Sequence, residues 1–194
     1  MSRLKLPSFV VLAVAMSVLL AVEASKTPAT NEEPRYTSDG RMLRPANYRE
    51  WIWLSSGLGM SYNPQPEPAA DPAFDNVFVN PTAYRTFTKT GTWPDKTVFV
   101  LELRASRSKG SINTGGHFQT GLMGLDIHVK GESRFRSKWA FFNFEGSADS
   151  AALIPTTADC YSCHEQHGAV DTTFVQFYPT LLPIAQQKKA VGKQ

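Results

Sequence analysis

The pattern of apolar and polar positions predicts strands through the middle of the chain. Over residues 97–104 the side chains separate onto the two faces of one strand. One face carries Phe99, Leu101 and Leu103, and the other carries Val98, Val100, Glu102 and Arg104. Apolar runs at 74–79 and 139–144 predict two further strands, and 117–130 predicts one long strand or two broken ones.

Helices are predicted on either side of these strands. Residues 45–58 are expected to be helical, because Pro45 suits a first helical position and Gly57 ends the run. A second helix is expected at 82–88, capped by Asn80 and ended by Gly91, and a short one at 148–154. The sum is an α+β fold with helices on one side of a mostly antiparallel sheet.

The two ends of the chain differ from its middle. Residues 1–24 have a basic start, a long apolar run and a small-residue cleavage site, which indicate a secretory signal peptide. An uncleaved membrane anchor is the alternative, although the run is short for a spanning helix. We expect a flexible segment at 25–40, one domain at 41–185 and a polar tail at 186–194.

Charge excludes two classes of partner. The 194 residues carry a formal charge of +3, which falls to about +2 if the signal is removed. No basic run is dense enough to suggest binding to nucleic acid or to an anionic membrane surface.

The decisive motif is Cys160-Tyr161-Ser162-Cys163-His164, which contains the only two cysteines of the sequence. The spacing C-x-x-C-H is the attachment signature of a c-type haem, with the thiols bonded to the porphyrin and the histidine as the iron ligand. A redox C-x-x-C motif, a zinc site and a structural disulfide are the alternatives. The redox motif lacks its βαβ context, and the zinc site lacks a second pair of ligands. A disulfide leaves His164 unexplained. One covalent haem c per chain, ligated by His164, is therefore predicted.

The sixth position of the iron has several candidate ligands. The candidates are Met42, Met60, Met123, His117, His128 and His167. No methionine follows His164, whereas small electron-transfer cytochromes have a ligating Met after their haem motif. His128 lies in an alternating strand and is expected to point outward, and His167 is too close in sequence to His164 to reach the other haem face.

Several short segments together resemble the cytochrome P-460 family and its relatives, the cytochromes c′-β. They are 45–51, 77–81 with Tyr84, Thr90-Gly91, 139–141, Pro155-Thr156, and Asp171 with Phe174 and 177–179. The resemblance implies a five-stranded antiparallel sheet with flanking helices, a homodimer, and a haem whose second axial side is open.

The family that the chain resembles includes enzymes, which oxidise hydroxylamine and cross-link a lysine to the porphyrin. This chain departs from those enzymes at one position. Leu101 stands at the lysine's position, and leucine cannot form that bond. Lys96 belongs to the opposite strand face. The acidic group that these enzymes need has no assigned counterpart; Glu145 and Asp149 lie upstream of the motif and are expected to be solvated.

The departure favours the non-catalytic branch, whose members bind small gases. We expect an apolar wall of Leu101, Phe74, Phe78, Phe99 and Phe118 around the open side of the haem. Such a wall offers no hydrogen-bond donor to oxygen, whereas nitric oxide binds ferrous iron without one. The hypothesis is a periplasmic nitric-oxide-binding cytochrome with a possible redox partner protein. A hydroxylamine-oxidising or peroxidase-type enzyme and a six-coordinate electron carrier are the alternatives.

Overall fold

The structure is a computed structural model that describes residues 32–62 and 69–192, so the predicted signal peptide lies outside the described residues. Its centre is one antiparallel sheet in the order β2-β3-β4-β5-β6. The strands are β2 (Ile52–Leu58), β3 (Phe74–Val79), β4 (Val98–Arg107), β5 (Phe118–Lys130) and β6 (Trp139–Glu145). The predicted α+β class is confirmed, and 117–130 forms a single long strand.

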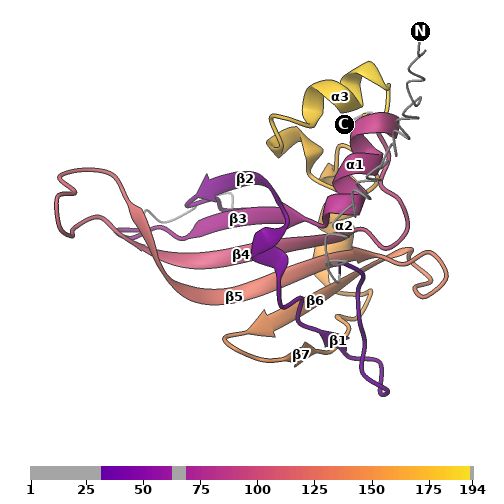
Figure 1. Ribbon diagram of the computed structural model, residues 1–194, viewed down its shortest axis with the longest axis horizontal. Helices are drawn as coiled ribbons and strands as arrows, with labels where there is room; N and C mark the ends of the chain where they lie inside the picture. Colours follow the sequence, from indigo (N-terminus) through magenta and orange to yellow (C-terminus); the bar gives the residue numbers. More distant parts are fainter. Residues whose placement is uncertain (1–31, 63–68, 193–194) are drawn as a thin grey trace, which may run out of the picture.

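Three α-helices occur within the described residues: α1 (Pro81–Thr90), α2 (Asp159–His167) and α3 (Leu182–Gln187). Two 3₁₀ turns, η1 (Tyr48–Glu50) and η2 (Val175–Phe177), and a small pair of strands, β1 (Met42–Leu43) and β7 (Ser150–Ala151), complete the fold. Figure 1 shows α1 and α3 together on one side of the sheet and the β1–β7 pair on the other.

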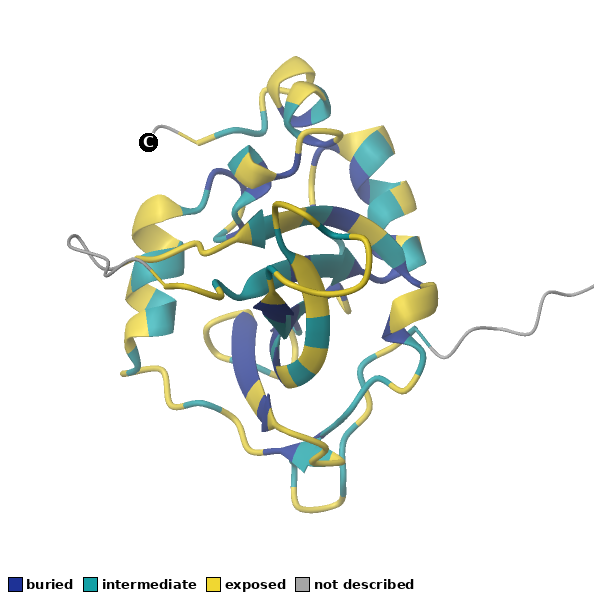
Figure 2. Cartoon of the chain, turned by 90° about the vertical axis from the view of Figure 1, so that its left-hand side faces the viewer, coloured by how far each residue is buried: buried dark blue, intermediate teal, exposed yellow. Residues whose placement is uncertain are grey.

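The sheet separates two apolar cores. On the helical side, buried residues of α1 and of the C-terminal region pack on Phe99 of β4. On the other side, Val98 and Val100 pack beneath β1 and β7. The burial colours of Figure 2 place dark strands at the centre and exposed faces on the outer helices. The predicted alternation of β4 is thus confirmed, since neighbouring residues serve different cores.

The predicted helix at 45–58 is wrong. Only Tyr48–Glu50 make a single 3₁₀ turn, and Ile52–Leu58 form β2, which pairs with β3 through a bulge between Trp53 and Ser55. Aromatic and β-branched residues in this run favour a pleated strand. Pairing with β3 also satisfies the backbone groups along one side of this edge strand, which outweighs the local helix signals of Pro45 and Gly57.

The predicted helix at 148–154 is also wrong. Ser150 and Ala151 pair with β1, and Leu153 forms a bridge to Phe142 of β6. The helix at 82–88 is confirmed with wider bounds and ends at Gly91, whose φ of 77° is left-handed. The side chain of Asn80 does not cap this helix; its Oδ1 accepts a hydrogen bond from the Val98 backbone N–H at 2.8 Å.

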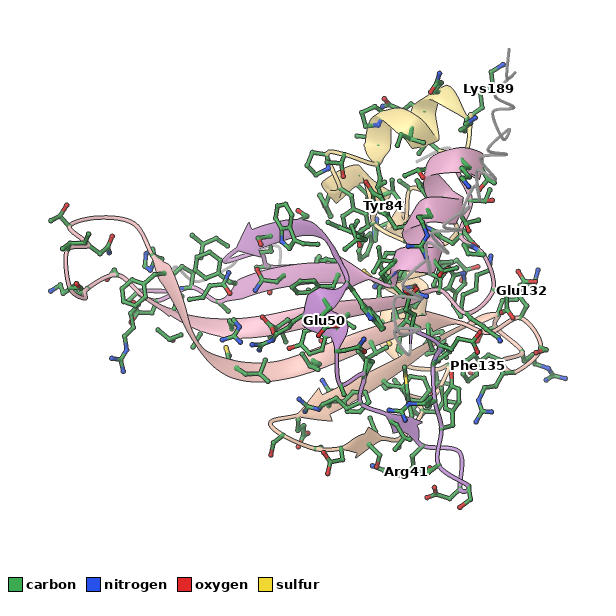
Figure 3. The ribbon with its side chains drawn as sticks, in the orientation of Figure 1. Arg41, Glu50, Tyr84, Glu132, Phe135 and Lys189 are labelled. Carbon is green, nitrogen blue, oxygen red and sulfur yellow. The ribbon has the colours of Figure 1, made fainter. Side chains whose placement is uncertain are left out.

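Both ends of the described chain lie against the body of the protein. Tyr36, inside the predicted flexible segment, packs edge-on against Phe135 of the β5–β6 loop, which is labelled in Figure 3. Near the other end, Ala190 and Val191 pack against the helical-side core. Among the described residues, the helices are all too short or too polar to cross a membrane.

Candidate functional site

Helix α2 carries the C-x-x-C-H motif. Cys160 and Cys163 lie one helical turn apart, both half-buried and with free thiols. Burial raises the pKa of the Cys160 thiol. Asp159 occupies the first turn, where its charge complements the helix dipole. The helix therefore presents two reduced sulfurs from a single face.

A cavity of about 620 Å³ lies between α2 and the helical-side face of the sheet. Its wall combines residues from β2 to β6 with residues from α2 and the η2 region. The principal lining residues are Ser55, Gly57, Met60, Tyr62, Asp75, Val77, Phe99, Leu101, Asp126, His128, Phe141, Cys160, Cys163, His164, Thr173, Phe174 and Phe177. Its size and largely apolar wall suit a cofactor rather than a metal ion alone.

His164 is held in one orientation. Its Nδ1 donates a hydrogen bond to the Thr172 carbonyl oxygen at 2.8 Å, which leaves Nε2 with its lone pair. Aromatic rings surround the imidazole, with centroids at 4.2 Å for Phe174 and 4.7 Å for Phe141. Burial lowers the pKa of His164, so the neutral, ligating form is favoured.

The donor set is that of a prosthetic group rather than of a bare metal ion. Within residues 32–62 and 69–192, no three His, Cys, Asp or Glu side chains are arranged to hold an ion. One neutral imidazole beside two free thiols, at the edge of a large cavity, matches what covalent haem attachment requires.

Comparison with known proteins agrees with this geometry. The cytochrome P460 family model matches residues 45–175. The chain belongs to the cytochrome P460 family. No curated protein matches the chain. As a cytochrome P460 family member it is a haem-binding protein, and the cavity beside His164 fits that group in size, wall and ligand.

The structure places five predicted residues of this cytochrome at the haem cavity. Cys160, Cys163 and His164 come from α2, while Phe99 and Leu101 come from β4. Leu101 thus faces the cavity, as the alternation of β4 predicts. Because the strand at this point offers an alkyl group, this chain has no amine there to bond with a porphyrin.

Three of the predicted wall residues lie outside this cavity. Phe78 pairs with Val100 and packs against Tyr48, on the sheet face away from the cavity. Phe74 shares the parity of Phe78 on the same strand and is absent from the cavity wall. Phe118 pairs with Arg107 near the tip of the β4–β5 hairpin and is 39% exposed. An aromatic residue type does not reveal which face of a strand it occupies.

Other aromatic residues form the haem pocket in their place. Phe141 comes from β6, and Phe174 and Phe177 come from the segment after α2. Phe174 and Phe177 are three residues apart and follow the C-x-x-C-H motif closely, and this spacing and nearness are the sequence signals that could have assigned them. Val77 on β3 lies two positions from Asp75 and shares its face.

The wall is not wholly apolar, contrary to expectation. Ser55, Asp75 and Asp126 line the same cavity. Burial raises the pKa of Asp75, and the nearby charge of Asp126 raises it further. Asp126 accepts a hydrogen bond from Asn143 Nδ2 at 2.6 Å. Glu145 and Asp149, the two acids named upstream of the motif, are exposed and line no part of this cavity.

Of the candidate sixth ligands, Met60 and His128 line the haem cavity. His128 does not point outward as expected: it is 7% exposed, and its ring stacks on Phe141 at 4.1 Å. It also contacts the edge of the His164 ring, at 4.8 Å between centroids, so it lies beside the predicted ligand rather than across from it. Burial lowers the pKa of His128 well below its usual range.

The remaining candidate ligands lie away from the haem cavity. Met123 is 55% exposed, Met42 is fully buried in the core beneath β1, and His167 is exposed at the end of α2. His117 lies near Ser106, with 3.4 Å between its Nδ1 and the serine Oγ.

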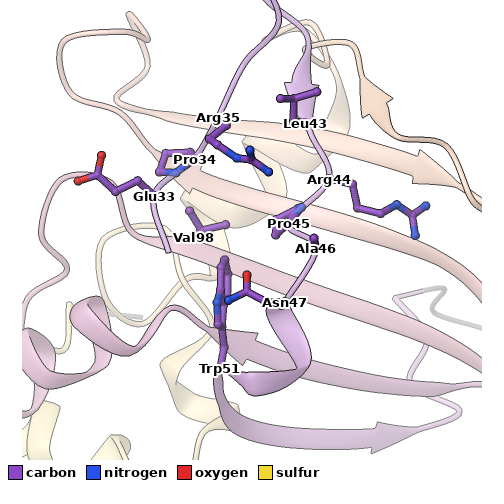
Figure 4. A pocket seen from close by; sticks show the side chains of 10 residues that line it. All are labelled: Glu33, Pro34, Arg35, Leu43, Arg44, Pro45, Ala46, Asn47, Trp51 and Val98. Atoms are coloured by element: carbon purple, nitrogen blue, oxygen red, sulfur yellow. The ribbon is translucent and has the colours of Figure 1, made fainter. Parts of the chain in front are cut away.

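A second, smaller cavity of about 200 Å³ lies on the opposite face of the sheet (Figure 4). It is lined by Glu33, Pro34, Arg35, Leu43, Arg44, Pro45, Ala46, Asn47, Trp51 and Val98. Arg44 directs its guanidinium to the carbonyl oxygens of Ala148 and Gly146, at 2.8 and 2.5 Å. No motif residue lines this cavity, so the larger cavity is the candidate haem site.

Proposed function

We propose that this chain is an exported c-type cytochrome with one covalent haem, which binds nitric oxide on the side of the iron opposite His164. One observation carries the proposal: two free thiols, a neutral imidazole and the Leu101 side chain line the same large cavity. The thiols of Cys160 and Cys163 would hold the porphyrin, and Nε2 of His164 would hold the iron. The haem supplies a ferrous iron able to take up a small gas.

Selectivity follows from the groups that the protein places around that gas. Leu101, Val77 and Phe99 are apolar and donate no hydrogen bond. Bound oxygen gains stability from a donor, whereas nitric oxide needs none.

Haem attachment is tested on protein produced by export with intact cytochrome maturation. We expect haem stain to stay with the denatured polypeptide on a gel, and to be lost when Cys160→Ala and Cys163→Ala are combined. A wild-type chain that releases all its haem on denaturation contradicts the covalent assignment.

Gas binding is tested by titrating the reduced protein with nitric oxide. We expect a high-spin ferric spectrum before the protein is reduced, and an absorption change at low micromolar nitric oxide once it is reduced. Met60→Leu is the matched control, because Met60 lines the cavity and could fill the sixth position. A reduced wild type that is inert to nitric oxide, but becomes reactive as Met60→Leu, would identify an electron carrier instead.

A second candidate function, hydroxylamine oxidation, is favoured by the two carboxylates in the cavity wall. Oxidation of hydroxylamine releases protons as well as electrons. Asp75 and Asp126 could accept the protons, while an added electron acceptor takes the electrons. Against this stands Leu101, which replaces the lysine expected of enzymatic relatives.

The two functions are separated by steady-state assay and by spectrum. An ordinary c-type spectrum after denaturation, with no turnover of hydroxylamine in the presence of a dye acceptor, supports the gas-binding function. Turnover that falls at least tenfold in Asp75→Asn, with haem content unchanged, supports the enzyme.

We further propose a periplasmic location, a homodimer and a redox partner protein that reduces the haem. The dimer is supported by large apolar side chains at the surface, such as Trp53 and Met123, each 55% exposed. Sedimentation of the haem-loaded protein at micromolar concentration should give twice the monomer mass.

A further inference from the structure

The turn that follows α2 has an unusual backbone. Asp171 and Thr172 both adopt positive φ, at 46° and 63°. For a β-branched residue such as Thr172 this conformation is rare and costs energy, so it persists only where neighbouring groups hold it. The carbonyl oxygen of Thr172 is the acceptor for Nδ1 of His164. The carbonyl oxygen that accepts the hydrogen bond from the predicted iron ligand therefore belongs to a strained turn.

A buried lysine holds one side of this turn. Lys130, at the end of β5, is 8% exposed and lies 2.8 Å from Asp171 Oδ2. Its Nζ also donates to the Trp93 carbonyl oxygen at 2.9 Å, and it lies over the ring of Trp139. A buried ammonium needs such partners to offset its desolvation. The sheet is thus tied to the residue immediately before Thr172.

The other side of the turn is held by Trp93. Its Nε1 donates to Thr173 Oγ1 at 2.9 Å, and that hydroxyl donates to the Val170 carbonyl oxygen at 2.6 Å. Backbone hydrogen bonds between Val170 and Thr173 close the turn. Lys130 and Trp93 together fix residues 170–173 from both sides, although neither residue lines the haem cavity.

We propose that Lys130, acting through Asp171, is a positioning residue for the iron ligand. The ion pair holds the Thr172 carbonyl where it accepts the Nδ1 proton of His164. A well-placed acceptor makes the imidazole a stronger donor through Nε2, as hydrogen-bonded ligating histidines generally are. The inference rests on the proposed role of His164 as haem ligand. It adds that Lys130 strengthens the bond between His164 and the iron.

The test compares haem-loaded variants in the reduced state without added gas. Lys130→Met keeps the length of the side chain and removes its charge, while Asp171→Asn removes the opposite charge at a more exposed position. We expect both to lower the frequency of the iron–histidine stretching band and to raise the reduction potential. Lys130→Arg should restore the wild-type values at least in part, and Lys89→Met, at an exposed position on α1, should leave them unchanged.

Each outcome decides between a positioning role and a merely structural one. Variants that lose thermal stability but keep the wild-type band and potential overturn the proposal. If Lys130→Met does not fold, Asp171→Asn alone carries the test. Absence of any covalent haem in the wild type overturns the proposed function first. A shifted band in a protein that ignores nitric oxide overturns gas binding and supports the role of Lys130.

Discussion

At the scale of the residue, His164 acquires its chemistry from three neighbours. The Thr172 carbonyl fixes which nitrogen carries the proton, and the rings of Phe174 and Phe141 fix the plane of the imidazole. The ring is therefore oriented before any iron ligates it, which lowers the entropy lost on ligation. Side chains elsewhere in the cavity wall determine which small molecules can approach the proposed iron site.

Leu101→Asn places a hydrogen-bond donor in the apolar part of that wall. We expect oxygen affinity to rise about fivefold relative to nitric oxide affinity, because one hydrogen bond contributes about 1 kcal/mol. Stopped-flow measurement of both gases checks this. Leu101→Val, which stays apolar, is the control, and an equal change of both affinities in Leu101→Asn would contradict the selectivity argument.

Asp75 gives a pH dependence of known sign. Burial and Asp126 raise its pKa in the folded state, so folded protein binds a proton more tightly than unfolded protein does. Stability is therefore full below the ordinary carboxyl pKa and declines as pH rises through the raised value. Asp75→Asn should be more stable than wild type in urea at pH 7 and equal to it at pH 3. If Asp75→Asn were less stable than wild type at pH 7, favourable interactions of the ionised carboxylate would have to outweigh the cost of its burial.

At the scale of the element, β4 serves two environments at once. Leu101 faces the haem cavity, while the next residue, Glu102, is buried on the opposite face at 3% exposure. Arg104 Nε and Arg49 Nη2 approach the Glu102 carboxylate at 2.6 and 2.8 Å, and the Tyr48 hydroxyl also donates to it. This cluster ties η1 to the middle of the sheet.

Glu102→Gln tests what the cluster contributes. Burial alone would raise the pKa of Glu102, but hydrogen bonds from Tyr48 and Arg104 outweigh it and hold the pKa below its ordinary value. Its stabilisation is thus present above the ordinary carboxyl pKa and is lost as pH falls through the lowered value. We expect the variant to lose about 2 kcal/mol of unfolding free energy at pH 7.

The same urea measurement should show the loss shrinking as the pH falls through the lowered pKa of Glu102, where the wild-type carboxylate also takes up a proton. A pH-independent difference would mean that shape, rather than charge, is what Glu102 supplies.

At the scale of the whole molecule, the sheet divides the protein into a side that holds the candidate haem cavity and a side that holds the core beneath β1 and β7. The large cavity lies on the first side, whereas the core beneath β1 and β7 is filled by protein side chains. Removal of the haem therefore leaves a large apolar space on one side alone. Stability should fall unevenly across the fold.

Hydrogen exchange on the Cys160→Ala, Cys163→Ala protein freed of haem checks this. We expect protection to be lost in α2 and in the segment through η2, and to remain in the paired centres of β4 and β5. Uniform loss of protection throughout the described chain would show that the two cores unfold as one unit.

The sequence by itself determined the features that depend on neighbours along the chain. The alternation of β4, the bounds of β3 and the spacing of Cys160, Cys163 and His164 are local patterns with a fixed geometric meaning. Together they predicted the α+β class and the haem ligand, while the resemblance to the family implied that Leu101 faces the haem.

Tertiary structure alone decided the features that depend on partners far away in sequence. Ile52–Leu58 form a strand because β3 is available to pair with them, and Phe78 faces away from the cavity because of its register with β4. Asp75 and Asp126 meet in one cavity only because β3 and β5 both flank β4. Such contacts arise from packing and long-range pairing, whose energies no local pattern encodes.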